Sequence, residues 1–182
     1  MKPRFYQSRL AAKLLYYPSL LWDFVVCRIF RGLHHWDEID QFLILGAFPH
    51  RRHLPALLAA GVQAVVNTCA ESEGPLSEYE RLDIEQLRIP VVDFTEPTLG
   101  QIRSAIEFIE QYRALGKTVY VHCKSGRGRS STIVLCWLIH CHNLCPEVAQ
   151  RRLQDRRGQV LRHLDRRDVV QRFWGEIQVK NG

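Results

Sequence analysis

Hydrophobic residues gather in short runs along the middle of the chain, and polar or amphipathic segments separate these runs. Four runs of strand length are apolar nearly throughout: residues 42–45, 64–67, 87–92 and 118–122. Two segments that lie between these runs, residues 54–60 and 101–115, have the pattern of helices, which Gly61 and Gly116 are expected to end. Strands that are apolar on both faces are typical of a parallel sheet covered by helices. The pattern predicts an α/β three-layer sandwich with a mainly parallel central sheet, and functional loops beyond the carboxyl ends of its strands.

Further helices are predicted after the last strand. Residues 132–144 form an apolar segment of helix length, and Pro146 is well placed to open the next helix. The C-terminal third is strongly basic, with Arg151, Arg152, Arg156, Arg157, Arg162, Arg166 and Arg167. Such a run is most often a solvated helical face, and contact with acidic lipid headgroups is the alternative interpretation.

The N-terminal segment, residues 1–36, differs from the rest. Its first 13 residues carry four cations and no acid, and an apolar, aromatic-rich run follows over residues 14–30. Pro18, Asp23 and Arg28 interrupt that run, so it falls short of the roughly 20 apolar residues that a membrane span needs. A surface-lying membrane anchor, an uncleaved targeting segment and a helix packed on the domain all remain open. Residues 37–182 are expected to form one catalytic domain.

Composition narrows the functional classes. The 182 residues, 46% of them hydrophobic, suffice for one well-cored domain. The net charge of +6 and the pI near 9.2 favour anionic partners such as acidic lipid or a phosphorylated substrate. No nucleic-acid motif and no Walker-type loop accompany the charge, so neither nucleic acid nor nucleotide-driven transfer is expected. The six cysteines lack the regular spacing of a disulfide framework, which favours a reducing compartment.

The stretch TVYVHCKSGRGRS, residues 118–130, carries the candidate chemistry. A strand that runs through a glycine-bearing loop into a helix makes an anion site, because backbone N–H groups converge there. Cys123 stands at the end of the strand, where those groups and nearby cations favour the nucleophilic thiolate. Arg129, six residues on, can bind two phosphoryl oxygens with its planar fork. Ser130 can assist departure of the thiolate, and Gly126 and Gly128 allow the positive φ angles that such a loop requires.

Other cysteines in the chain invite competing interpretations. Cys145 and Arg151 have the same spacing as Cys123 and Arg129, but Pro146 and a helical pattern follow, so that pair predicts a helix N-terminus. A buried core cysteine is the alternative for Cys123 itself. A zinc cluster is a further possibility, but its candidate ligands lie along one apolar helix rather than in paired loops, so no metal is predicted; they are Cys136, His140, Cys141, His142 and Cys145.

Acidic residues follow two of the predicted strands. Asp93 ends the run 87–92 and should share a sheet edge with Cys123, as a general acid for the leaving oxygen requires. Glu96 is the alternative acid, and a turn aspartate that caps the next helix is the alternative role for Asp93. Glu71 and Glu73 follow the strand 64–67 and form either a functional acidic loop or a solvated turn.

The motif HCKSGRGRS resembles the signature loop of the cysteine-dependent protein tyrosine phosphatase superfamily, in its dual-specificity branch. The segments FLILGAFP, AVVNTCAESE, LRIPVVDFTEPT and YRALGKTVYVHCKSGRGRS are similar, in that order, to the mitochondrial-type phosphatidylglycerophosphate phosphatases of this branch. YYPSLLWDFVVCRIFRG is similar to their N-terminal segment, so the resemblance covers nearly the whole chain. The chain departs from it at Ala70 and Ser72, where the acidic loop of that family carries a glutamate and a tyrosine.

The resemblance implies a metal-independent, cofactor-free phosphatase that works through a cysteinyl phosphate in phosphatidylglycerol and cardiolipin biosynthesis. Cys123 would be the nucleophile, Arg129 the transition-state ligand and Asp93 the general acid and base. His122, by its place next to the nucleophile, is expected to organise the loop through a hydrogen bond and not to transfer protons. The loop that binds the phosphate would comprise Lys124, Ser125, Gly126, Arg127 and Gly128. Lys124 and Arg127 favour a substrate with a second anionic group.

Other functions remain open: a phosphoinositide phosphatase, a dual-specificity phosphoprotein phosphatase, or a non-catalytic binder of anionic membranes or phosphoproteins. The expected protein is a monomer in peripheral contact with a membrane. Its place would be the cytoplasmic side of a bacterial membrane or the matrix side of the mitochondrial inner membrane.

Overall fold

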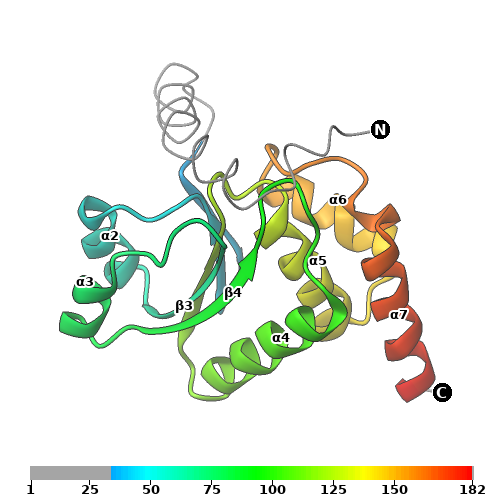
Figure 1. Ribbon diagram of the computed structural model, residues 1–182. Helices are drawn as coiled ribbons and strands as arrows, with labels where there is room; N and C mark the ends of the chain where they lie inside the picture. Colours follow the sequence, from blue (N-terminus) through cyan, green and yellow to red (C-terminus); the bar gives the residue numbers. More distant parts are fainter. Residues whose placement is uncertain (1–33, 182) are drawn as a thin grey trace.

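The fold is built on one five-stranded sheet, shown by the computed structural model, which describes residues 34–181 (Figure 1). The strands lie in the order β1, β2, β5, β3, β4. Four of them are parallel, and β1 is antiparallel to β2 at one edge. Their bounds are β1 Trp36–Asp40, β2 Leu43–Gly46, β3 Val62–Cys69, β4 Glu85–Val91 and β5 Thr118–His122.

Helices cover both faces of the sheet and complete three layers, so the predicted sandwich is confirmed (Figure 1). One face carries α2 (Leu54–Ala59) and α3 (Leu76–Arg81). The other carries α4 (Leu99–Ala114), α5 (Arg129–His142), α6 (Pro146–Arg156) and α7 (Asp168–Asn181), and the 3-10 turns are η2 (Arg51–His53) and η3 (Leu164–Arg166). Strand alternation divides the hydrophobic residues between the layers, because Leu43 and Leu45 face the larger core and Ile44 the smaller one.

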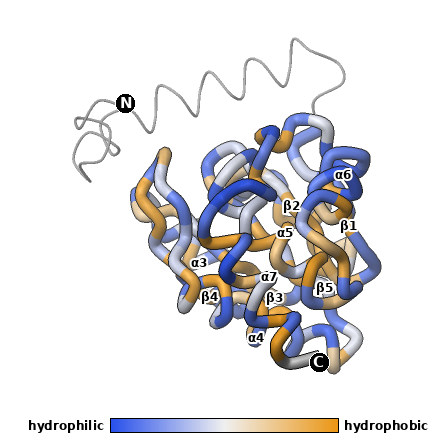
Figure 2. The backbone as a smooth tube through the Cα atoms, turned by 90° about the vertical axis from the view of Figure 1, so that its right-hand side faces the viewer, coloured by the Kyte–Doolittle hydropathy of each residue, from blue (hydrophilic) through white to orange (hydrophobic). Residues whose placement is uncertain are grey.

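Helix α5 lies in the middle of the larger core. Its residues 129–139 are all buried, and Figure 2 shows its hydrophobic character beside the hydrophilic α6. The helix ends at Asn143, whose left-handed conformation (φ 48°) is a common stop. Because β5 and α5 are both fixed in the core, the six-residue loop between them is held at both ends.

Three elements were not predicted from the sequence. Edge strand β1, WDEID, mixes polar and apolar residues, and α3 is only six residues long. Helix α7 packs Val170, Phe173 and Ile177 into the larger core, but these residues stand among arginines and charged neighbours that obscured their spacing.

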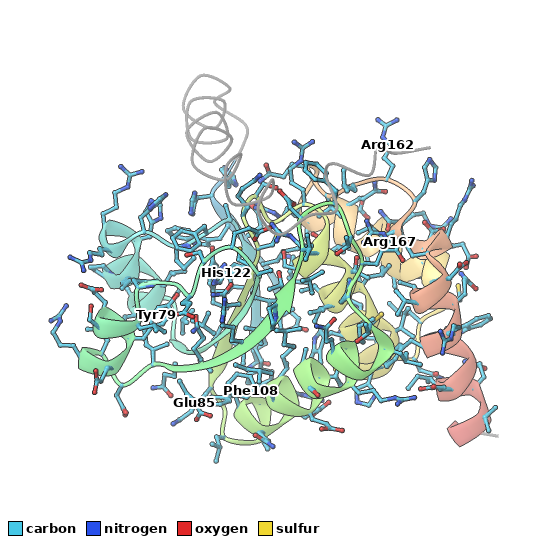
Figure 3. The ribbon with its side chains drawn as sticks, in the orientation of Figure 1. Tyr79, Glu85, Phe108, His122, Arg162 and Arg167 are labelled. Atoms are coloured by element: carbon cyan, nitrogen blue, oxygen red, sulfur yellow. The ribbon has the colours of Figure 1, made fainter. Side chains whose placement is uncertain are left out.

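The basic C-terminal run is not one solvated face. Arg151, Arg156 and Arg162 are exposed, and Arg162 extends outward from the molecule (Figure 3). Arg157, in contrast, is buried, and Arg167 is largely covered. The single-face interpretation was wrong, because the chain leaves the helix at Arg157 and turns back over the sheet edge.

The predicted N-terminal segment, residues 1–36, lies outside the described residues except for its last three positions. Among residues 34–181, no helix combines the length and the apolar character that crossing a membrane requires.

Candidate active site

The loop 123–128 lies at the carboxyl edge of the sheet, between β5 and α5. Gly126 adopts φ +66°, the left-handed conformation that glycine tolerates best. A Cβ atom on Gly126 would lie 2.4 Å from the carbonyl oxygen of Gly46 at the end of β2. Both the backbone conformation and the close contact therefore require glycine at this position. The loop therefore packs directly on the neighbouring strand.

Backbone and side-chain donors converge on the sulfur of Cys123. The N–H of Gly126 donates to Sγ at 3.2 Å, and the N–H groups of Arg127 and Ser130 also donate to it. The buried Ser130 hydroxyl faces the sulfur and has no other hydrogen-bond partner among the described residues. Burial alone would raise the pKa of the thiol, but the Arg129 guanidinium and these donors outweigh it and lower the pKa. Cys123, only 2% exposed, is thus poised as a thiolate.

Arg129, which is 3% exposed, is bound by negative groups. Its Nη1 donates to both carboxylate oxygens of Glu71, at 3.0 and 2.8 Å, and to the Val91 carbonyl at 2.8 Å. Its Nη2 lies 3.1 Å from Asp93 Oδ1. Burial would lower the pKa of the guanidinium, but the Cys123 thiolate and the nearby acids raise it. Glu71 therefore occupies Nη1, whereas Nη2 has Asp93 beside it but no hydrogen-bond partner among the described residues.

Asp93, two residues beyond the end of β4, reaches the same edge as Cys123. Lys124 Nζ donates to its Oδ2 at 2.7 Å, and the Asp93 N–H donates to Glu71 at 2.9 Å. Burial would raise the pKa of this carboxyl, but Arg129 and Lys124 lower it. Asp93 is ionised and paired in this state.

The alternatives for Asp93 do not fit the structure. Thr98 and Gln101 form a reciprocal capping box at the start of α4, so Asp93 is not the cap of that helix. Glu96 lies 3.4 Å from Arg167 in an ion pair.

The loop residues differ in where they point. Arg127 is turned outward, and its Nε donates to the Gln159 carbonyl at 3.0 Å. Gly128 has φ −124°, so the positive φ predicted there was wrong. Its lack of a side chain serves packing instead, because a Cβ would lie 3.2 Å from Leu161 Cδ1.

Of the two glutamates in the loop after β3, only one reaches the site. Glu71, 2% exposed, binds Arg129, so the solvated-turn alternative was wrong for it. Glu73 is 64% exposed and pairs instead with Arg88 at 3.2 Å.

His122 forms the hydrogen bond to the loop that the sequence suggested. Its Nδ1 lies 3.2 Å from the Cys123 carbonyl, and the side chain is fully buried inside the molecule (Figure 3). Burial lowers its pKa to about 3, which leaves the imidazole neutral at physiological pH. A neutral buried ring orients the loop and does not shuttle protons.

Comparison with known proteins identifies the family. The family described as dual specificity phosphatase, catalytic domain, matches residues 43–167. The chain belongs to this family. It is 39% identical over 164 residues to phosphatidylglycerophosphate phosphatase PTPMT2 of Arabidopsis thaliana. The aligned region covers 88% of this chain and 72% of that protein.

Two further relatives of this dual-specificity phosphatase extend the comparison. Human phosphatidylglycerophosphatase and protein-tyrosine phosphatase 1 is 35% identical over 180 residues, covering 93% of this chain and 89% of that protein. The crystal structure of PTPMT1 in complex with PI(5)P is 32% identical with a TM-score of 0.75, covering 82% of this chain and all of that chain. This dual-specificity phosphatase is accordingly a cysteine-dependent enzyme that hydrolyses phosphoesters.

The described part of this phosphatase holds no group of three or more His, Cys, Asp or Glu side chains arranged to bind a metal ion. Of the cysteines considered for zinc, Cys136 lies on α5 and is buried in the larger hydrophobic core. Burial raises the pKa of its thiol, so that it is neutral.

Sequence reasoning missed two residues that contact the loop of this phosphatase or its nucleophile. Cys69, at the end of β3, packs with Cys123, and burial raises the pKa of its thiol. Its place at the carboxyl end of a strand was an available signal. Arg157 reaches the outer side of the loop, and nothing in the run of arginines distinguishes it.

Proposed function

We propose that this protein is a phosphatidylglycerophosphate phosphatase that works through a cysteinyl phosphate. The observation that carries the chemistry is the ring of N–H donors around a buried, low-pKa thiol, with Arg129 beside it. The similarity to phosphatidylglycerophosphate phosphatases over most of the chain supports the lipid.

In the first step, Cys123 Sγ attacks phosphorus in line, and the bond from phosphorus to the glycerol oxygen breaks. Arg129 and the loop N–H groups bind the three equatorial oxygens, over which the negative charge of the transition state is spread. The phosphate first displaces Asp93 from Arg129 and binds the side of the guanidinium that Glu71 leaves open. Asp93 then faces a dianion without that partner, so its pKa rises; it takes a proton from solvent and passes that proton to the leaving oxygen.

In the second step, water attacks the cysteinyl phosphate and the sulfur leaves as a thiolate. Asp93, now a carboxylate, takes the proton of the water, and inorganic phosphate is released. The Ser130 hydroxyl, which faces Sγ, stabilises the departing thiolate by hydrogen bonding. When phosphate leaves, Asp93 releases this proton to solvent and pairs again with Arg129, so Cys123 and Asp93 return to their initial states.

The proposed setting is a membrane surface, because the substrate is a lipid. The protein acts as a monomer in peripheral contact with the matrix side of the mitochondrial inner membrane or the cytoplasmic side of a bacterial membrane. The net charge of +6 supports attraction to acidic headgroups.

A substrate panel tests the lipid. Phosphate release from phosphatidylglycerophosphate should exceed that from phosphoinositides and a phosphotyrosine peptide by about tenfold or more, the equivalent of one extra charge-assisted hydrogen bond. Release is measured in mixed micelles, with Cys123→Ser as the blank. A clear preference for the peptide would contradict the lipid assignment.

A phosphoinositide phosphatase is the second candidate. A PTPMT1 structure was solved in complex with PI(5)P, and the loop of this chain carries the cations Lys124 and Arg127. Lys124 contacts Asp93, and Arg127 is exposed and contacts the Gln159 carbonyl through Nε alone. A preference for phosphoinositides in the same panel would favour this candidate.

Asp93→Asn tests the general acid. With phosphatidylglycerophosphate, whose alcohol is a poor leaving group, kcat should fall by about 10²- to 10³-fold. With p-nitrophenyl phosphate, whose phenol leaves readily, the loss should be much smaller. The wild-type rate should fall as pH rises through the pKa of Asp93 in the complex, and this basic limb should be absent in Asp93→Asn.

Glu96→Gln is the matched control, because Glu96 lies nearby but pairs with Arg167. Its pH profile should keep both limbs. Equal losses on both substrates in Asp93→Asn, or a basic limb that persists, would rule out the acid role.

A further inference from the structure

Arg157 is a buried cation behind the phosphate-binding loop. It directly follows α6 and is 1% exposed, and its Nη1 lies 2.5 Å from Asp37 Oδ2 in β1. A buried guanidinium is costly unless a counter-charge and hydrogen bonds compensate for lost hydration. The partners of its remaining N–H donors therefore show what this side chain holds in place.

Those donors bind backbone carbonyls from two segments that are distant in sequence. On the loop, Nε donates to the Gly126 carbonyl at 3.1 Å and Nη2 to the Ser125 carbonyl at 3.3 Å. At the start of the described chain, Nη1 donates to the His34 carbonyl at 3.2 Å and Nη2 to the His35 carbonyl at 3.5 Å. One side chain thus ties the loop to the entrance of β1.

The loop contacts fall on two consecutive peptide units, and each unit faces the sulfur on its other side. The Ser125–Gly126 unit gives its oxygen to Arg157 and its N–H to Cys123 Sγ, at 3.3 and 3.2 Å. The Gly126–Arg127 unit gives its oxygen to Arg157 and its N–H to the same sulfur. In a planar trans peptide the C=O and N–H point in opposite directions. Fixing the two oxygens from behind therefore aims the two N–H groups at the sulfur.

We propose that Arg157 is a positioning residue for phosphoryl transfer, which holds two peptide units of the loop by their oxygens and so directs their N–H groups at Cys123 and the transferring phosphate. It touches neither the sulfur nor the substrate. Its charge also polarises both units, which strengthens the N–H donors on the far side. The proposal rests on the cysteine chemistry proposed above but not on the identity of the lipid.

A purely structural Arg157 would tie β1 to the domain and contribute only stability. The two roles differ in what they do to Cys123. Misaimed N–H groups would stabilise the thiolate less and raise the pKa of the thiol. A loss of stability alone would leave that pKa unchanged.

The test is Arg157→Lys, which keeps the charge but loses the fork. With p-nitrophenyl phosphate, kcat/KM should fall by about 10- to 100-fold, the loss expected for weakening one or two hydrogen bonds to a charged group. The acid limb of the pH–rate profile should move to higher pH, and the pH dependence of Cys123 alkylation by iodoacetamide should move with it. Arg156→Lys, an exposed neighbour, should change kcat/KM by less than about twofold.

An unmoved acid limb and an unmoved alkylation profile in folded Arg157→Lys would overturn the proposal, even if the melting temperature fell. Ser131→Ala covers the case in which Arg157→Lys does not fold. The Ser131 hydroxyl donates to the same Gly126 carbonyl at 3.1 Å, so its loss should move both profiles in the same direction by a smaller amount. Unmoved profiles in Ser131→Ala would then overturn the proposal.

These readouts are separable from the proposed lipid function. If the wild-type protein cleaves p-nitrophenyl phosphate but not phosphatidylglycerophosphate, the proposed function fails while the test of Arg157 stands.

Discussion

Cys123→Ser should abolish turnover on every phosphomonoester while leaving the fold intact. The hydroxyl of serine ionises far less readily than the thiol, whose pKa the loop N–H groups and Arg129 lower, so the nucleophile is lost. The expected fall in kcat is on the order of 10⁴-fold or more. Phosphate release from p-nitrophenyl phosphate measures it. Inorganic phosphate should still bind, because the donors of the loop remain.

The chain supplies its own control for this variant. Cys145 has an arginine six residues on, as Cys123 does, but it stands at the N-cap of α6 and forms no loop. Cys145→Ser should leave kcat within about twofold of the wild type. Acid quenching during turnover should trap phosphate on Cys123 in the wild type and in Cys145→Ser, and not in Cys123→Ser. Turnover that persists in Cys123→Ser would rule out Cys123 as the nucleophile. Repeated failure to trap the intermediate on a protein without turnover would favour a non-catalytic binder.

The loop and its sheet could be predicted because their signals are local. An apolar run such as 118–122 needs burial on both faces, and a glycine-bearing loop before an apolar helix specifies an anion site without knowledge of distant residues. Parallel strands also bring their carboxyl ends together, so the order of elements alone predicts that Asp93 lies near Cys123. These inferences require only the order of elements along the chain.

The two glutamates show where local signals end. Glu71 and Glu73 are spaced by one residue in the same loop, and only the conformation of that loop decides which one turns inward. Glu71 reaches Arg129, whereas Glu73 meets Arg88 on β4. Both residues carry the same side chain and lie in the same short loop. The sequence therefore identified the two candidates but could not show which of them binds Arg129.

The burial of Arg157 could not be predicted from the sequence either. This residue is one of eight arginines between residues 151 and 172, and its neighbour Arg156 is exposed while Arg157 is buried. The difference arises because α6 ends at Arg156, which releases the next residue toward the loop and β1. A long-range contact of this kind leaves no periodic trace in the sequence.

Arg129→Lys should lower kcat by about 10³-fold while KM changes much less. Lysine keeps the positive charge that attracts the phosphate, but its single ammonium cannot bind two equatorial oxygens at once. Those oxygens spread into one plane in the transition state, where the planar fork matches them best, so the loss falls on kcat rather than on ground-state binding. Steady-state kinetics with p-nitrophenyl phosphate separate the two parameters.

The melting temperature provides the check on folding, because Glu71 is buried against the same guanidinium and loses its two-point contact in the variant. A fall of a few degrees is expected, and kinetics are therefore measured well below the transition. Arg151→Lys is the matched control, since Arg151 is exposed and follows Cys145 at the same spacing, and it should leave kcat within about twofold. If Arg129→Lys raised KM with kcat unchanged, the guanidinium would serve uniform binding and not the transition state. The Glu71 and Asp93 contacts would then be the main reason for an arginine at position 129.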